Sequence, residues 1–193
     1  MKALSIFSFL FIFLFLLTSC SEDEILDETT LIQNEETLIK ATESNDFITI
    51  RVESLADMTD NRATGPNPGD YCNISFDINS NKEIDADIDF GYESATENYD
   101  ICSYYFLGDD VITHCAGHPT TAKFSEYFTA SSTLTTPHII WELKISKEEL
   151  NQTRTLSFTV KTIDQGEFRI YPTNISNNNP REFYFNKTLT FNW

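Results

Sequence analysis

From Asp46 onward, apolar and polar residues alternate in short runs rich in β-branched and aromatic side chains, and turn-forming residues separate the runs. Alternation with a period of two residues is typical of strands that bury one face. It predicts strands at Phe47–Val52, Tyr71–Ile78, Glu83–Tyr92, Asp100–Leu107, Val111–Cys115, Lys123–Thr129, His138–Ile145, Thr155–Ile163, Glu167–Tyr171 and Glu182–Phe191. Their spacing favours one all-β domain over residues 46–193, an antiparallel β-sandwich of the Ig-like or jelly-roll-like kind.

Three short segments between these runs have the composition of defined turns. Gly108-Asp109 predicts a two-residue hairpin loop, because glycine at the first position favours such loops. Asp164-Gln165-Gly166 predicts a second hairpin, in which the glycine supplies a positive φ. The segment Ser146–Leu150 fits a capping box and predicts a single helical turn between strands.

The hairpin loop at Gly108-Asp109 places Cys102 directly opposite Cys115. In that register they form a non-hydrogen-bonded pair with Cα atoms about 4.5 Å apart, a distance that a disulfide accepts. The sequence therefore predicts a Cys102–Cys115 disulfide, which would stabilise the fold by about 3 kcal/mol in the chain-entropy model. Cys72 is left over, and we expect it to be a small buried hydrophobe.

His114, Cys115 and His118 form a short cluster of transition-metal ligand types. Successive residues of a strand point to opposite faces, so His114 and Cys115 do not reach one ion while the strand continues between them. This argument favours the disulfide over a transition-metal site.

Asp85, Asp87 and Asp89 alternate with apolar residues, which places three carboxylates in a row on one face of a predicted strand. Hard cations take several carboxylate oxygens, so the functional interpretation is a calcium site. The alternative is a solvated sheet face, because the spacing departs from the EF-hand loop. Calcium is the one cofactor that the sequence suggests.

The segment from residue 20 to residue 45 is acidic and contains few apolar residues. Such a composition buries too little apolar surface to offset the entropy of ordering, and it predicts a flexible tether. Apolar pairs at Ile25-Leu26, Leu31-Ile32 and Leu38-Ile39 leave a weak helix as the alternative.

Residues 1–19 combine the cation Lys2 with an apolar run over Leu4–Leu17, and Leu17-Thr18-Ser19-Cys20 follows. This segment resembles a bacterial lipoprotein signal peptide, which implies cleavage before Cys20 and lipidation of that cysteine. The next residues, Ser21-Glu22-Asp23-Glu24, resemble the export signal of Bacteroidota surface lipoproteins. The resemblance implies a lipid-anchored protein of the outer membrane, exposed at the cell surface.

The formal charge of the whole chain is −17. Loss of Lys2 with the leader makes it −18, and such a surface repels the phosphates of nucleic acids. The sequence contains no GxSxG, HExxH or Gly-rich phosphate-binding motif, so it indicates no catalytic residues.

Tyr92 and Tyr99 flank the polar stretch Glu93–Asn98, and we expect their rings to be exposed and to bind a ligand. Together with the expected location, this favours a non-enzymatic surface lipoprotein that binds a glycan or a protein partner. The alternatives are a cell-surface hydrolase that acts on polymers and an accessory or structural subunit of an outer-membrane complex.

Overall fold

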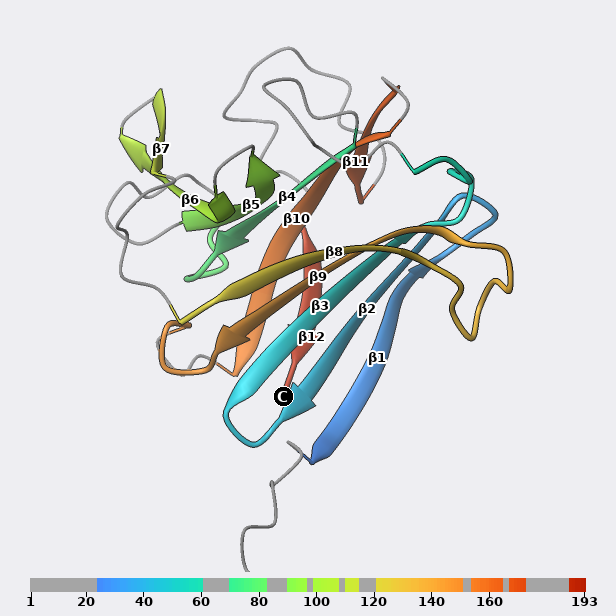
Figure 1. Cartoon of the computed structure of the whole chain (residues 1–193). Helices are drawn as coiled ribbons and strands as arrows, with labels where there is room; N and C mark the ends of the chain where they lie inside the picture. The colour runs from blue at the N-terminus through green and yellow to red at the C-terminus, as the bar shows by residue number, and fades with distance from the viewer. Residues whose placement is uncertain are drawn as a thin grey trace, which may run out of the picture.

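The computed structural model describes residues 24–60, 70–82, 90–96, 99–107, 110–114, 121–150, 154–164, 167–172 and 188–193. These residues form two antiparallel sheets that pack face to face, so the predicted all-β sandwich is confirmed (Figure 1). In the described part of the chain, no helix has the length and hydropathy to cross a membrane.

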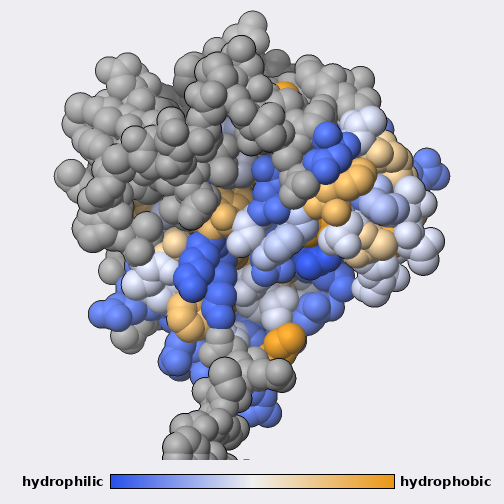
Figure 2. All heavy atoms as spheres, viewed as in Figure 1, coloured by the Kyte–Doolittle hydropathy of each residue, from blue (hydrophilic) through white to orange (hydrophobic). Residues whose placement is uncertain are grey.

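The first sheet has five strands. Its order is β1 (Ile25–Gln33), β2 (Thr37–Ser44), β3 (Phe47–Ser54), β9 (His138–Ser146) and β8 (Lys123–Thr129). Figure 2 shows that the described part of its outer face is mostly hydrophilic, with apolar residues scattered over it.

The second sheet has seven strands. Six follow the order β11 (Glu167–Tyr171), β10 (Thr155–Asp164), β4 (Tyr71–Asp77), β5 (Phe90–Thr96), β6 (Tyr99–Leu107) and β7 (Asp110–His114). The seventh, β12 (Leu189–Asn192), pairs with the first part of β10, whereas β11 pairs with its last part.

Most predicted strands agree with the observed ones to within a few residues. Lys123–Thr129 and Glu167–Tyr171 have the predicted bounds. The prediction at Glu83–Tyr92 falls largely outside the described residues, and β5 begins at Phe90. The last predicted strand also begins outside them, and β12 covers Leu189–Asn192.

The register predicted for the β6–β7 hairpin is confirmed, and so is the presence of the second predicted hairpin, between β10 and β11. Leu107 pairs with Asp110 and Ser103 with His114 across β6 and β7, which leaves Gly108-Asp109 as the two-residue loop. Asp164 pairs with Glu167 across β10 and β11. Turn residues alone therefore determined the pairing of these strands.

The predicted flexible tether is wrong for residues 25–44, which form β1 and β2. β2 is a central strand, and its apolar residues Leu38, Ile39 and Ala41 are at most 2% exposed. β1 is an edge strand whose side chains are largely exposed, and its pairing with β2 is irregular at two places. An edge strand with few buried residues has an acidic, polar sequence, which is why composition suggested disorder.

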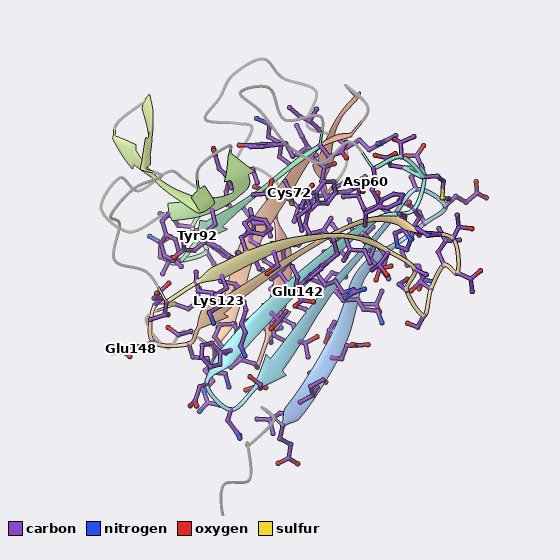
Figure 3. The ribbon with its side chains drawn as sticks, viewed as in Figure 1. Asp60, Cys72, Tyr92, Lys123, Glu142 and Glu148 are labelled. Carbon is purple, nitrogen blue, oxygen red and sulfur yellow. The ribbon has the colours of Figure 1, made fainter. Side chains whose placement is uncertain are left out.

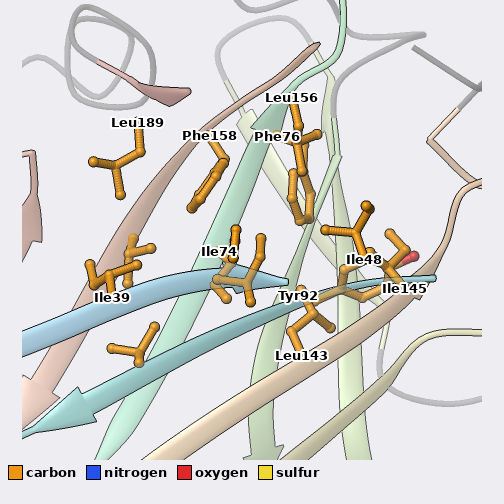
Figure 4. Close-up of a cluster of buried hydrophobic side chains, with 14 of the residues drawn as sticks. Ile39, Ile48, Ile74, Phe76, Tyr92, Leu143, Ile145, Leu156, Phe158 and Leu189 are labelled. Atoms are coloured by element: carbon orange, nitrogen blue, oxygen red, sulfur yellow. The ribbon is translucent and has the colours of Figure 1, made fainter. Parts of the chain in front are cut away.

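The core lies between the two sheets, and both contribute to it. The side chains that Figure 4 labels are Ile39, Ile48, Leu143 and Ile145 from the first sheet and Ile74, Phe76, Tyr92, Leu156, Phe158 and Leu189 from the second. The ring centroid of Phe76 lies 6.1 Å from that of Phe158 and 6.3 Å from that of Tyr92. Trp141 of β9 is fully buried.

Candidate functional site

An open groove lies at the end of the sandwich where β1 begins, which we call the groove end. It has a volume of about 680 Å³. The residues that line it are Glu43, Asn45, Asp46, Phe47, Thr121, Ser146, Lys147, Glu148, Arg154 and Trp193. They come from five segments: the β2–β3 turn with the strand ends beside it, the residues before β8, the end of β9 with the residues after it, the residue before β10 and the residue after β12. Strand pairing thus brings distant parts of the chain together.

Two contacts join the β2–β3 turn to the segment after β9. The backbone N–H of Lys147 donates to the carbonyl oxygen of Asp46 over 2.9 Å. The Lys147 ammonium lies 2.5 Å from a carboxylate oxygen of Glu43, and both side chains are more than four-fifths buried. A partly buried ion pair with a backbone bond beside it fixes this wall of the groove.

The segment after β9 forms the single turn that the sequence predicts. Ser146 Oγ accepts the backbone N–H of Glu149 over 3.1 Å, and the Ser146 carbonyl oxygen accepts that of Leu150 over 3.4 Å. The Ser146 side chain thus caps the turn as in a capping box. Figure 3 shows Glu148 near the tip of this turn.

The Glu149 side chain connects this turn to both sheets. Its carboxylate accepts the Tyr92 hydroxyl over 2.8 Å and the Thr121 hydroxyl over 2.7 Å, together with the backbone N–H of Thr121. Tyr92 belongs to the second sheet, and Thr121 precedes β8 of the first. Glu149 therefore fixes the position of Thr121 in the groove.

Two aromatic side chains line the groove, and each is held by a second contact. The half-buried Trp193 stacks on the buried Phe191, with ring centroids 6.0 Å apart and an interplanar angle of 26°. Its backbone N–H donates to the carbonyl oxygen of Arg154 over 3.0 Å. The ammonium of Lys144 lies 4.3 Å from the centroid of the half-buried Phe47 ring. Both rings are therefore positioned before any ligand arrives.

Exposed polar groups surround these rings. Asn45, Asp46, Glu148 and Arg154 are exposed, and no hydrogen bond or ion pair engages their side chains among the described residues. They present carboxylate and amide oxygens as acceptors and amide and guanidinium N–H groups as donors. The groove thus combines apolar rings with donors and acceptors of both charges.

The expectation that Tyr92 is exposed and binds a ligand is corrected by its burial. The residue is 3% exposed, and its hydroxyl donates to Glu149. Tyr92 lies on the inner face of β5, where its ring contacts Phe76 and Phe90 (Figures 3 and 4). Its partner Glu149 lies 57 positions away in the sequence, so local polarity gave no sign of it.

The other predicted site residues lie outside what the structure describes. They are Cys20, Asp85, Asp87, Asp89, the side chains of Tyr99 and Cys102, and Cys115. Cys72 is free and fully buried, as predicted, and burial raises the pKa of its thiol. No group of three His, Cys, Asp or Glu side chains among the described residues is arranged to hold a metal ion.

A second polar cluster lies on the outer face of the first sheet, around the buried Glu53. This carboxylate accepts Arg51 Nε over 2.7 Å, Ser131 Oγ over 2.7 Å and His138 Nε2 over 3.0 Å. Burial raises the pKa of Glu53, but hydrogen bonds from its three neighbours, with Arg51 the largest, bring it below its usual value. Because Glu53 and His138 are both buried, we assign this cluster to stability and not to ligand binding.

Sequence reasoning missed the groove, although part of its signal was present. Asn45-Asp46 between two strands indicates an exposed turn, and Trp193 directly follows a strand. These residues meet in one site only because of the strand order. It pairs Phe47 with Ser146 and Thr155 with Asn192. Comparison of the chain with protein-family models, curated proteins and solved structures finds no match.

Proposed function

We propose that this protein is a surface-exposed, lipid-anchored binding module whose groove binds a carbohydrate. The observation that carries the proposal is the groove itself, in which Trp193 and Phe47 lie among exposed carboxylate, amide and guanidinium groups. A sugar ring has apolar C–H faces and a rim of hydroxyls, and this combination of groups matches both.

The size of the groove also supports a small polar ligand. Ligand sites usually have volumes of about 300–1,000 Å³, and the value here lies in that range. A protein partner would more often be met by a large exposed apolar patch. The exposed large hydrophobic residues among the described ones are Ile25, Leu26, Met58 and Tyr127, and none of them lines the groove.

The lipid anchor is the second part of the proposal, and it is supported by the leader and Cys20. The substitution Cys20→Ala should abolish labelling with palmitate and release the protein from membranes. Protease shaving of intact cells tests surface exposure of the wild type. A Cys20→Ala protein that sediments with membranes as the wild type does would contradict the anchor.

The groove can be tested with the unlipidated Cys20→Ala protein. Oligosaccharides from bacterial and host surfaces would be titrated by calorimetry, and Trp193→Ala should weaken binding at least tenfold, which corresponds to about 1.4 kcal/mol. Tyr127→Ala is the control, because Tyr127 is an exposed aromatic residue that does not line the groove. Equal affinity of both variants would contradict the proposal, provided that urea unfolding shows both to be folded.

A hydrolase is the second candidate, because three carboxyl side chains, Glu43, Asp46 and Glu148, line the same groove. Glycoside hydrolysis needs two of them at a suitable separation. Glu43 is already paired with Lys147, which favours binding over catalysis. Release of reducing ends from a bound oligosaccharide, lost in Asp46→Asn or Glu148→Gln, would establish the hydrolase instead.

A further inference from the structure

The strand that begins the domain places the groove end close to the proposed anchor. β1 begins at Ile25, only five residues after Cys20. Five residues span at most about 18 Å even when fully extended. A tether reaching residue 45 would have allowed the domain to stand far from the membrane, but the structure excludes this because residues 25–44 belong to the sheet.

The start of β1 also adjoins the groove directly. Ile25 pairs with Ser44, which lies between the groove residues Glu43 and Asn45. Paired strands lie about 4.8 Å apart, so one wall of the groove is a single strand spacing from the point where the chain enters the domain. Figure 1 shows the C-terminal end of the chain at this same end of the sandwich.

The opposite end of the sandwich is much farther from the anchor. β1 runs away from the groove end for nine residues, which corresponds to about 30 Å. To turn the far end of the domain to the membrane, the link would have to run along the whole length of the domain. A link of at most about 18 Å is too short for a domain about 30 Å long. The groove end is therefore the end that faces the lipid.

A second observation points the same way. Ile25 and Leu26 are 65% and 52% exposed, the highest values among the exposed large hydrophobic residues that the structure describes. Among the described residues they are the apolar ones nearest to Cys20 in the sequence. Burial of apolar side chains at the headgroup boundary of a membrane is favourable.

We infer that the groove opens onto the membrane that holds Cys20, so that its ligand is the headgroup sugar of a glycolipid in the same leaflet. This inference rests on the proposed lipid anchor and carbohydrate groove. The charges of the groove disfavour an anionic headgroup, because Glu43, Asp46 and Glu148 outnumber Lys147 and Arg154. A large polymer arriving from outside would have to enter the narrow space beneath the domain.

The orientation can be measured with the two tryptophans of the chain, Trp141 in the core and Trp193 at the groove. The lipidated protein is reconstituted in phosphatidylcholine vesicles that carry a nitroxide-labelled headgroup. Emission from Trp193, isolated in Trp141→Phe, should be quenched at least twofold more than emission from Trp141, isolated in Trp193→Phe. Equal quenching in the two variants would overturn the orientation.

A lengthened link is the matched control. Thirty Gly/Ser residues inserted before Ile25 add a root-mean-square reach of about 30 Å, so the preferential quenching of Trp193 should disappear. Preferential quenching that survives the insertion would show that the short link does not set the orientation.

Hydrogen exchange of the unsubstituted protein measures the orientation if a tryptophan variant fails to fold. Amides of residues 45–47 and 147–149 should exchange more slowly on vesicles than in Cys20→Ala, and those of residues 130–136 should not.

The position of the ligand is tested with an oligosaccharide that binds Cys20→Ala in solution, displayed on micrometre-sized beads. Vesicles that carry the protein with the lengthened link should capture the beads, and vesicles that carry the wild-type protein should not. Equal capture would overturn the same-leaflet ligand. Failure of the lipidated protein to enter vesicles, or of every oligosaccharide to bind in solution, would instead refute the proposed function.

Discussion

Replacing Glu53 by alanine is the perturbation whose cost the structure defines best. Glu53 is 2% exposed, and its carboxylate accepts hydrogen bonds from Arg51, Ser131 and His138. Ser131 Oγ in turn accepts the backbone N–H groups of Thr133 and Leu134 over 3.1 and 3.2 Å. The carboxylate therefore fixes the loop between β8 and β9 on the outer face of the first sheet.

The size of the effect follows from which partners are left without an acceptor. The side chain of Arg51 is 32% exposed, so it can turn to water and costs little. His138 is fully buried, and its Nε2 loses its partner without access to water. Leaving a buried donor without its acceptor costs about 1–3 kcal/mol, and we expect that range for Glu53→Ala. For a domain of this size the melting temperature should fall on the order of 5 °C.

Urea unfolding of the Cys20→Ala protein measures this difference. Glu142→Gln is the matched control, because Glu142 pairs with the same Arg51 over 3.4 Å while 33% exposed, and exposed pairs contribute about 0–1 kcal/mol. The pKa of Glu53 is lower in the folded protein than its usual value of 4.5. The carboxylate therefore adds to the free energy of unfolding at pH values above 4.5, and this stabilisation is lost as the pH falls through the folded-state pKa. If Glu53→Ala is no more destabilising than Glu142→Gln at pH 7, the network does not stabilise the loop as argued.

Three further predictions concern other parts of the chain. Non-reducing peptide mapping should recover Cys102 linked to Cys115, because extending the observed register by one residue beyond Ser103 and His114 places them opposite each other, and any other linkage would contradict this prediction. If Asp85, Asp87 and Asp89 bind calcium, a chelator should lower the melting temperature, and Asp87→Asn should remove that sensitivity. A wild-type melting curve that the chelator does not change would contradict the calcium site and favour a solvated sheet face. Tyr92→Phe should destabilise the fold by about 1.5–3 kcal/mol, because it removes the hydroxyl that Glu149 accepts, and a urea midpoint equal to that of the wild type would refute this.

Local signals in the sequence were sufficient for most of the strands after Asp46 and for the turns between them, but not for β1, β2 or the site. The loop at Gly108-Asp109 predicted one register, because a two-residue turn leaves one way to pair its flanking strands, and the turn before Glu167 predicted a second hairpin. The capping residue Ser146 likewise placed its turn correctly. Each of these features depends on residues within a few positions of one another.

The errors arose where burial depends on distant partners. β2 lies in a segment that is acidic overall, yet its residues Ile39 and Ala41 are fully buried because β3 and the opposite sheet cover them. Tyr92 adjoins a polar stretch, but the position of its partner Glu149 depends on the arrangement of both sheets. The groove combines five separate segments, and no periodicity along the chain reports which segments meet.

The exposed edge at β1 bears on how many copies can share a membrane. The proposed lipid anchor would confine copies of the protein to two dimensions and give them all the same orientation, which raises the chance that open strand edges meet and join into fibres. The pairing of β1 with β2 is irregular between Ile25 and Asp27 and again between Thr30 and Ile32, and Asp27 places negative charge on this edge. Bulges break the hydrogen-bonding ladder and like charges repel, so crowded copies should remain separate, each with a groove of its own.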